Sequence, residues 1–306
     1  MFTFALNKQP TAKTGNGTPL CNDHQTLRLS QNLKYKIRMT LDILICSLNK
    51  GIVRIGDMLR PARENVRYIV SYQYTDDRYL ELIPEELKQR TDVSVYKYRG
   101  QGLSANRNLA LEKSTADLVM YADDDARFSD NSFDIIFNTF ETHPEVDVAF
   151  FCASTYKGKA LKSYPQEEQA ITALPETYSI STIEMVFRRG KVKGAVRFDE
   201  RFGLGTKFLT CGEEDVWLTD ALRQGLNMRY FPKKIIETST MLKRNLVYID
   251  AGVQRSKGAF EYYLHGNKAW WKCFCFALTS TRKGMCHFLP MMRHLAEGIR
   301  YMQRTK

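Results

Sequence analysis

Short, almost continuous apolar runs, each closed by turn-forming residues, most restrict how this chain can fold. They occupy residues 41–48, 66–74, 93–98, 116–122 and 146–154. Runs of this length are typical of strands that are buried on both faces, as in a parallel sheet covered by helices. A helical pattern at 103–114 separates two of them, and this alternation predicts an α/β fold with a mostly parallel sheet. In such sheets ligands bind beyond the carboxyl ends of the strands.

Three consecutive carboxylates stand directly after one of these runs. Asp123, Asp124 and Asp125 follow the apolar residues 116–122, so we expect them at the ligand-binding edge of the sheet. Alternate side chains of an extended segment share a side, so Asp123 and Asp125 would face one way and Asp124 the other. Two carboxylates on one side suit Mg²⁺ or Mn²⁺. A solvated acidic turn is the other interpretation.

A second acidic cluster consists of Glu213, Glu214 and Asp215. It opens a segment with the apolar spacing of a helix that ends at Gly225. At about 100° per residue, Glu213 falls on the outer face, whereas Glu214 and Asp215 both border the buried face. A partly buried carboxylate crowded by like charges has a raised pKa, which suits a general base. Periodicity does not choose between Glu214 and Asp215, and the helix dipole alone favours acidic residues in a first turn.

A glycine pattern indicates a rival function. Gly100, Gly102 and Ala105 fit G-x-G-x-x-A between a predicted strand and a predicted helix, and Asp123 stands about 20 residues further on, as in a dinucleotide-binding oxidoreductase. The pattern follows the third predicted strand rather than the first, however, and a ribose needs one carboxylate rather than three. A nucleotidyltransferase that activates sugar phosphates and a non-catalytic nucleotide-sugar binder are further alternatives.

Three segments, 43–51, 100–128 and 198–225, carry a resemblance to a known family. The first is similar to a nucleotide-binding strand, the second to a Gly-Ala-Arg-Asn helix that runs into a strand and a DxD motif, and the third to a glycine-containing loop with a Glu-Asp motif. In this order and spacing they resemble family 2 glycosyltransferases, such as those of bacterial surface-polysaccharide assembly. The resemblance implies a GT-A fold, a Rossmann-like sheet flanked by helices.

The resemblance also implies a reaction and residue roles. A sugar would pass with inversion from a nucleoside-diphosphate sugar to a hydroxyl of a saccharide or lipid-linked saccharide. Asp123 and Asp125 would hold the cofactor, Mg²⁺ or Mn²⁺, with Asp124 near the ribose. Asp215 would deprotonate the acceptor hydroxyl, and Glu214 would orient the acceptor. The nucleoside pocket would be lined by Ser47, Asn49, Gly102 and Arg107.

Two pairs of residues leave the specificity open. Ser71 and Gln73 stand in the nucleotide-binding region where the family usually has an acidic pair that contacts the base. UDP is therefore expected only because it is the commonest nucleotide. Phe208 and Trp217 would stack on an acceptor sugar or belong to the core.

The C-terminal segment carries most of the positive charge. The net charge is +11, and residues 265–306 hold eight Lys or Arg against one Glu. One helical face of this segment is apolar; it consists of Met291, Met292, Leu295, Ile299 and Met302. A basic amphipathic helix with Trp nearby suits an anionic membrane surface, whereas packing on the domain or on a partner is the other interpretation. No nucleic-acid-binding module is recognisable.

These patterns divide the chain into three parts. We expect a flexible leader at 1–36, a catalytic domain at 37–245 and a basic, aromatic helical tail at 246–306. The nucleotide-sugar half of the domain would span 37–128 and the acceptor half 129–245. Seven scattered cysteines, and no apolar run of about 18 residues, indicate a cytoplasmic protein that is at most peripheral on the cytoplasmic face of the membrane.

Overall fold

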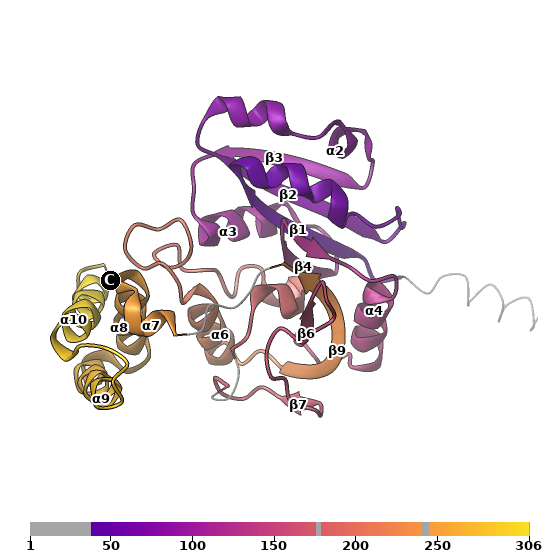
Figure 1. Ribbon diagram of the computed structural model, residues 1–306. Helices are drawn as coiled ribbons and strands as arrows, with labels where there is room; N and C mark the ends of the chain where they lie inside the picture. Colours follow the sequence, from indigo (N-terminus) through magenta and orange to yellow (C-terminus); the bar gives the residue numbers. More distant parts are fainter. Residues whose placement is uncertain (1–37, 176–178, 240–244, 306) are drawn as a thin grey trace, which may run out of the picture. The chain divides into compact units, whose positions relative to one another are not determined.

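A computed structural model describes residues 38–175, 179–239 and 245–305 (Figure 1). The chain divides into two units, Met1–Arg38 and Met39–Lys306, and every helix and strand named below belongs to the second. The leader expected at 1–36 lies outside the described residues.

Four parallel strands, in the order β3-β2-β1-β4, form the half of the sheet that positions the site. They are β1 (Leu41–Leu48), β2 (Val66–Tyr74), β3 (Val93–Arg99) and β4 (Leu118–Asp123). Seven of the eight residues of β1 are buried, because both faces of the sheet are covered, and this explains the uninterrupted apolar sequence. The runs predicted at 41–48 and 66–74 coincide with β1 and β2.

The sheet continues beyond β4 in mixed directions, in the order β8-β6-β9-β5, with β7 also on β9. These strands are β5 (Ala126–Arg127), β6 (Val148–Thr155), β7 (Gln169–Ala170), β8 (Met185–Arg188) and β9 (Met228–Thr238). β8 runs antiparallel to both β4 and β6, whereas β6 and β9 are parallel. A short antiparallel strand therefore joins two parallel groups.

Helices cover both faces of the sheet (Figure 1). α3 and α6 share a core with Leu44 of β1, whereas α4 shares the opposite core with Ile43 and Ile45. Successive residues of a strand point to opposite faces, so β1 contributes to both cores. The helical segments of this region are η1 (Asn49–Met58), η2 (Asp77–Leu82), α2 (Glu85–Gln89), α3 (Leu103–Lys113), α4 (Ser132–Thr142), η3 (Thr182–Glu184), α5 (Arg189–Val192) and α6 (Glu213–Arg223).

A buried carboxylate at the start of β1 fixes the position of β4. Asp42 is fully buried. It accepts hydrogen bonds from Arg67 Nε at 3.0 Å, from Ser114 Oγ at 2.9 Å and from the backbone N–H groups of Thr115 and Ala116 at 2.9 and 3.0 Å. A buried charge is tolerated when it is paired and fully hydrogen-bonded in this way. The turn from α3 into β4 is thereby held against β1, which sets where Asp123 emerges.

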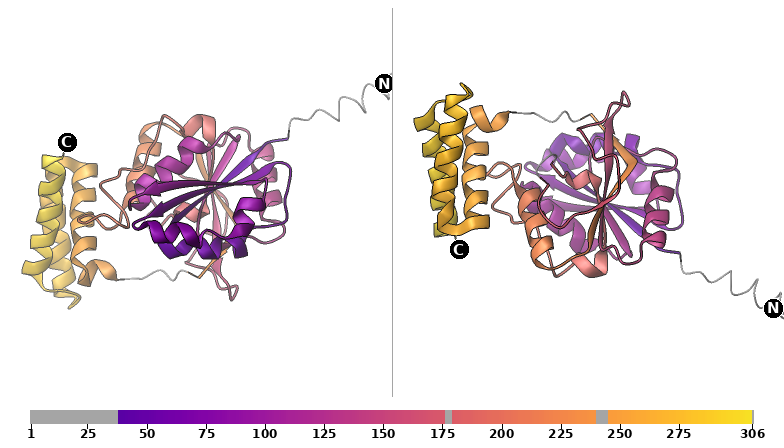
Figure 2. Two further views of the ribbon diagram at one scale, coloured as in Figure 1. Left: turned by 90° about the horizontal axis from the view of Figure 1, so that it is seen from above. Right: turned by 90° about the horizontal axis from the view of Figure 1, so that it is seen from below.

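The C-terminal helices form what we call the helical unit, residues 246–304. It consists of α7 (Leu246–Ile249), α8 (Ala251–His265), η4 (Gly266–Lys268), α9 (Ala269–Arg282) and α10 (Phe288–Arg304). α8 and α10 lie side by side (Figure 2), and glycines allow the close approach. A Cβ on Gly298 would lie 1.9 Å from the carbonyl oxygen of Arg255, and one on Gly258 would lie 2.1 Å from that of Leu295.

The apolar face predicted for the tail is confirmed, and it packs inside the protein. Met291, Leu295, Ile299 and Met302 are buried, and Met292 is partly buried. They face α8 and α9, so this face is not open to a membrane surface. Within the described ranges no helix is long and apolar enough to cross a membrane.

Candidate active site

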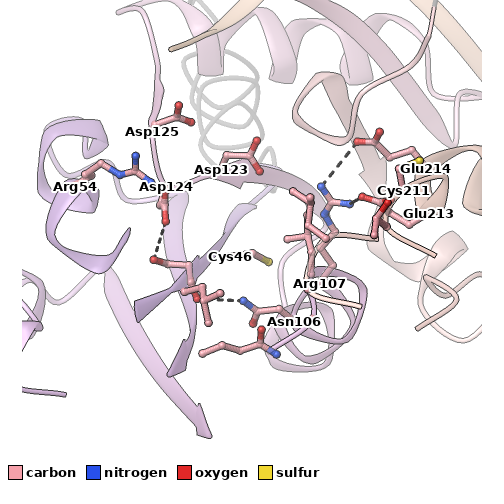
Figure 3. Close-up of a pocket in the computed structure, with 18 of the residues that line it drawn as sticks. Cys46, Arg54, Asn106, Arg107, Asp123, Asp124, Asp125, Cys211, Glu213 and Glu214 are labelled. Atoms are coloured by element: carbon pink, nitrogen blue, oxygen red, sulfur yellow. Dashed lines mark hydrogen bonds and ion pairs between the residues drawn. The ribbon is translucent and has the colours of Figure 1, made fainter. Parts of the chain in front are cut away.

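A pocket of about 780 Å³ opens at the carboxyl ends of β1 and β4 and at the start of α6 (Figure 3). It is located where the sequence places the ligand-binding edge of the sheet. Eight of the predicted site residues line it, namely Ser47, Gln73, Gly102, Arg107, Asp123, Asp124, Asp125 and Glu214. The pocket therefore brings together both acidic clusters, which are about 90 residues apart in the chain.

Asp124 is held on the β1 side of the pocket. Ser47 Oγ donates to its carboxylate at 2.9 Å, and Arg54 of η1 forms an ion pair with it. The backbone of η1 approaches closely here, because a Cβ on Gly51 would lie 1.9 Å from Asp124 Oδ2. Burial raises the pKa of Asp124, against the lowering effects of Ser47 and Arg54. Asp124 is thus a positioned carboxylate that is already neutralised by protein groups.

Asp123 and Asp125 differ from Asp124 in direction and in partners. Asp125 and Asp124 point to opposite sides (Figure 3), as the alternation predicted. Asp125 accepts from Thr238 Oγ1 at 3.3 Å and from Ser239. In the part of the chain that the structure describes, the Asp123 carboxylate accepts no hydrogen bond. Burial raises its pKa to about 6, although Arg107 opposes the shift.

The opposite wall is built around a buried ion pair. Arg107 of α3 donates from Nη1 to Glu213 Oε1 at 3.2 Å, and its Nη2 lies 3.8 Å from Glu214 Oε1. The guanidinium also stacks over the ring of Phe198, 5.1 Å from its centroid. Burial and the charge of Glu214 raise the pKa of Glu213, whereas Arg107 lowers it.

The prediction that Glu213 faces outward is wrong, because the residue is only 6% exposed. α6 begins at Glu213, directly after Gly212 in the left-handed region at φ +93°. Side chains of a helix tilt toward its N-terminus, so one in the first position reaches past the helix start. Here it reaches Arg107, which the projection of a continuous helix does not anticipate.

The two candidate bases have different surroundings. Glu214 lines the pocket, and its Oε1 accepts from the backbone N–H of Thr182 at 2.8 Å and from the Thr182 hydroxyl. Asp215 does not line the pocket, and its carboxylate accepts no hydrogen bond from the described residues. Partial desolvation, and then the charge of Glu214, raise the pKa of Asp215 to about 6, although the residue as a whole is exposed.

Two residues predicted for the nucleoside pocket lie beside it. Asn49, at φ +51°, accepts from the Thr75 N–H at 2.9 Å and so joins the ends of β1 and β2. Ser71 is fully buried in β2, and its hydroxyl has no hydrogen-bond partner in the described parts of the chain. Gln73, two residues along the same strand, does line the pocket.

The structure favours packing over acceptor stacking for Trp217 and Phe208, because neither ring lines the pocket. Trp217 is 2% exposed and packs between Phe187 and Phe198 in the core, because it lies on the buried face of α6. Phe208 lies outside the pocket lining, between Arg255 of α8 and Tyr301 of α10, at 4.7 and 4.8 Å. Packing in the core accounts for the position of Trp217. Contact with α8 and α10 accounts for that of Phe208.

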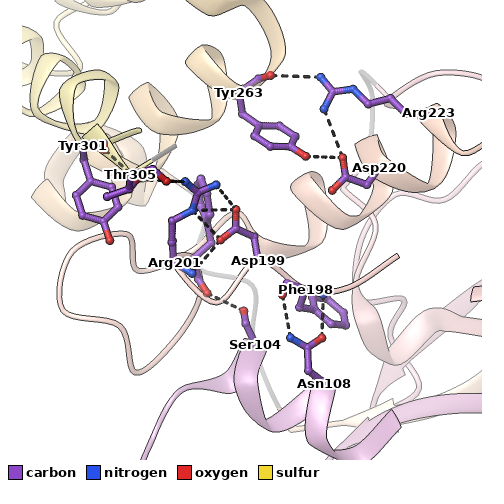
Figure 4. A network of polar contacts seen from close by, with 11 residues as sticks. Ser104, Asn108, Phe198, Asp199, Arg201, Asp220, Arg223, Tyr263, Tyr301 and Thr305 are labelled. Atoms are coloured by element: carbon purple, nitrogen blue, oxygen red, sulfur yellow. Dashed lines mark hydrogen bonds and ion pairs between the residues drawn. The ribbon is translucent and has the colours of Figure 1, made fainter. Parts of the chain in front are cut away.

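The glycine-containing loop of the third segment closes the pocket, but the sequence did not indicate which of its residues line it. Leu204, Gly205, Thr210 and Cys211 line it, and the helical unit holds this loop in place (Figure 4). Arg201 Nη1 donates to the carbonyl of Thr305 at 2.7 Å, and Ser256 Oγ accepts from the N–H of Cys211 at 3.2 Å. Arg54 was missed as well; η1 also contains Lys50 and Asp57, so no local pattern distinguished it.

Comparison with known proteins gives a family and a fold. Crystal structures of S. aureus TarS 1-349 are similar. The match to one of them covers 88% of this chain and 92% of the TarS chain, at 11% identity and a TM-score of 0.56. The complexes with UDP-GlcNAc and with UDP each cover 76% of this chain, and 70% and 69% of theirs, at 13% and 15% identity and TM-scores of 0.50 and 0.51.

At such identities the likeness concerns the fold, and with it the predicted GT-A fold is confirmed. No curated protein matched the sequence. The model of glycosyl transferase family 2 matches residues 42–199, more than half of the chain. The chain therefore belongs to glycosyl transferase family 2.

Proposed function

We propose that this glycosyltransferase moves a sugar, with inversion and with Mg²⁺ or Mn²⁺, from a nucleoside-diphosphate sugar to a hydroxyl of a saccharide acceptor. One observation carries the proposal: a single pocket has Asp123 to Asp125 on one wall and Arg107 with Glu213 and Glu214 on the other. The first wall suits a metal-bound diphosphate. The second wall contains Glu214, which is next in the chain to Asp215, the candidate base.

The residues on the first wall fit a divalent cation. Asp123 lines the pocket and its carboxylate is without a hydrogen bond in the described residues, so its oxygens are free for a ligand. Asp123 and Asp125 would hold the ion, and phosphate and water oxygens would complete its coordination, as Mg²⁺ commonly requires. No group of three or more His, Cys, Asp or Glu that could hold a metal occurs among the described residues. When bound, the ion neutralises charge on the departing diphosphate.

The donor nucleoside would lie between the ends of β1 and β2 and the start of α3. Ser47, Gln73 and Gly102 line this part of the pocket. Gly102 has φ +131°, which favours glycine and leaves its surface without a side chain. UDP-sugars are the first donors to test, because a protein of the same fold has been crystallised with UDP-GlcNAc and with UDP.

We retain Asp215 as the candidate base, although it lies outside the pocket lining, next to Glu214 in the chain. Glu214 is held by Thr182 through two hydrogen bonds, which suits a residue that orients the acceptor. Asp215 has a free carboxylate with a pKa of about 6. In the proposed step the acceptor oxygen bonds to the anomeric carbon, the bond from that carbon to the diphosphate oxygen breaks, and Asp215 takes the hydroxyl proton. Attack from the side opposite the leaving group inverts the configuration.

The acceptor would be a saccharide or a lipid-linked saccharide used in polysaccharide assembly. The family resemblance and the basic C-terminal segment support this class, and Leu204 offers an exposed apolar side chain in the pocket wall. A sugar face could pack on such a side chain while Glu214 accepts from a sugar hydroxyl.

The experiment is product analysis with a panel of UDP-sugars and other nucleotide sugars and candidate saccharide acceptors, with Mg²⁺, with Mn²⁺ and with a chelator. We expect free nucleoside diphosphate and a glycosylated acceptor only with metal. Asp123→Asn/Asp125→Asn should lower the rate roughly 100-fold or more, and Asp215→Asn by about 10²–10⁴. Asp57→Asn, at an exposed position outside the pocket lining, is the matched control.

Other products would identify one of the rival functions. Release of pyrophosphate from a nucleoside triphosphate and a sugar 1-phosphate would show a nucleotidyltransferase. Metal-independent binding of NAD would show a dinucleotide enzyme. Binding of a nucleotide sugar, with no product under any condition, would show a binder without catalysis.

A further inference from the structure

α9 carries apolar side chains on two faces, and only one of them is covered. Ala269, Cys273 and Ala277 are buried against the neighbouring helices. On the other side Trp271 is 69% exposed and Phe274 is 38% exposed. The internal contact also includes Trp270 and Phe276, which are partly buried. Trp271 and Phe274 therefore form a second apolar face that the described residues leave exposed.

The exposed rings are part of a continuous apolar surface. Trp271 stacks on Phe274 at 5.7 Å between centroids, and Phe274 and the partly buried Phe288 pack edge to face at 5.6 Å. Leu289, the next residue of α10, is 77% exposed. We call these four residues the aromatic edge. Contiguous exposed apolar surface of this kind marks a site of interaction.

Positive charge surrounds the aromatic edge, and no acidic side chain among the described residues is paired with it. The chain contains no Asp or Glu between Glu261 and Glu297. Lys272 and Arg282 lie within about 100° of Trp271 around α9. Lys268 directly precedes α9, and Lys283 directly follows it. All four are exposed, and none of them forms an ion pair with any residue that the structure describes.

Three other basic residues of the helical unit have acidic partners. Arg293 donates to Glu297 at 3.0 Å, with Arg255 3.7 Å from the same carboxylate, and Lys257 pairs with Glu261 at 3.0 Å. Arg300 and Arg304 of α10 also form no ion pair with a described residue. Four of the six basic residues of the helical unit without a described acidic partner therefore lie in α9 or directly beside it.

We propose that the outer face of α9, with the start of α10, docks on an anionic lipid bilayer. The aromatic edge would enter the headgroup region, where Trp favours an apolar body beside a polar surface. The four basic side chains would meet the lipid phosphates, and each contributes roughly fivefold to the partition coefficient. The buried face of α10 takes no part, so docking leaves the helical unit intact. The proposal does not depend on the reaction assigned above.

Vesicle co-sedimentation of the full chain tests the proposal. We expect binding to vesicles of phosphatidylcholine with phosphatidylglycerol, weak binding to phosphatidylcholine alone, and loss of binding at high salt. Arg282→Glu/Lys283→Glu should weaken partition roughly 30-fold or more, whereas Lys157→Glu/Lys159→Glu, at exposed positions of another turn, should not. Trp271→Ser should weaken it as well, and Val53→Ser, an exposed apolar residue of η1, is its control.

Fluorescence shows which tryptophan enters the bilayer. Trp217 is buried in the core, and Trp270 lies under the guanidinium of Arg300 at 5.6 Å. Brominated lipids should therefore quench the wild type and leave Trp271→Phe almost unquenched, with binding retained.

Three results would overturn the proposal: no preference for anionic vesicles, equal binding by the α9 variants and their controls, or quenching that persists in Trp271→Phe. A stable dimer in light scattering that Trp271→Ser dissociates would also overturn it, because a second copy of the chain would then cover the aromatic edge.

Discussion

Replacing Arg107 by Met should expose how strongly the pocket wall depends on its buried ion pair. The side chains of Arg107 and Glu213 are 5% and 9% exposed, so water cannot solvate the charge that remains. Removal of one member of a buried pair typically costs about 3–5 kcal/mol of folding free energy. We expect a loss of that size in Arg107→Met at neutral pH, whereas Arg197→Met, at a mostly exposed ion pair with Glu112, should change stability by less than about 1 kcal/mol.

A double-mutant cycle separates the pair from its surroundings. Glu213→Gln leaves Arg107 with Glu214 at 3.8 Å, so we expect a smaller loss, about 1–3 kcal/mol. In Arg107→Met/Glu213→Gln both charges are gone, and the loss should be smaller than the sum of the two single losses by about 1–3 kcal/mol. Urea unfolding followed by circular dichroism gives all four free energies.

The pH dependence gives an independent test of the same reasoning. The pKa of Glu213 is raised in the folded protein, and without Arg107, which lowers it, it should rise further. A raised carboxyl pKa means that the folded state holds a proton that the unfolded state releases. Stability then falls as pH rises from the unfolded pKa, near 4.3, through the folded pKa. The deficit of Arg107→Met relative to wild type should therefore shrink toward pH 4. Additive losses, or a deficit independent of pH, would refute this account.

Three further changes test other contacts. Gly298→Ala should lower the unfolding free energy by about 1–3 kcal/mol, because the new Cβ meets the Arg255 carbonyl; an unchanged melting temperature would show that α8 and α10 can separate freely. Phe208→Ala removes the ring contact with Tyr301, which holds the pocket-closing loop on α10. We therefore expect KM to rise several-fold with little change in kcat in steady-state kinetics. For Asp215, whose pKa is about 6, kcat/KM should fall tenfold per pH unit below that value; a flat profile, or the same limb in the residual activity of Asp215→Asn, would exclude it as the base.

The sequence predicts the parallel half of the sheet well, because a strand that is buried on both faces has a nearly continuous apolar sequence. β1 and β2 begin and end where their apolar runs do, and the helix expected at 103–114 is α3. The pocket position follows from the same pattern, since Asp123 must emerge where β4 ends. Short strands such as β5, β7 and β8, with two to four residues, are too brief for an alternation to appear.

The sequence does not predict which residues meet across the pocket. Arg107 and Glu213 are 106 residues apart, and nothing local to either shows the other. Helical periodicity also gave the wrong face for Glu213, because a residue at the start of a helix has no preceding turn to constrain it. For Phe208 and Trp217, the residue type fits stacking on a sugar as well as packing in protein, and only the tertiary contacts choose.

The helical unit links the pocket to the face of α9 mechanically. The loop that carries Leu204 and Cys211 into the pocket wall is held by α8 and α10 through Ser256, Arg255 and Tyr301. α9 packs on these same two helices. If α9 rests on a bilayer, the pocket wall is positioned by packed helices rather than by a flexible linker. The orientation of the pocket toward a membrane-borne acceptor would then follow from the fold, and loosening the α8–α10 contact should impair transfer to such acceptors more than transfer to the same saccharide free in solution.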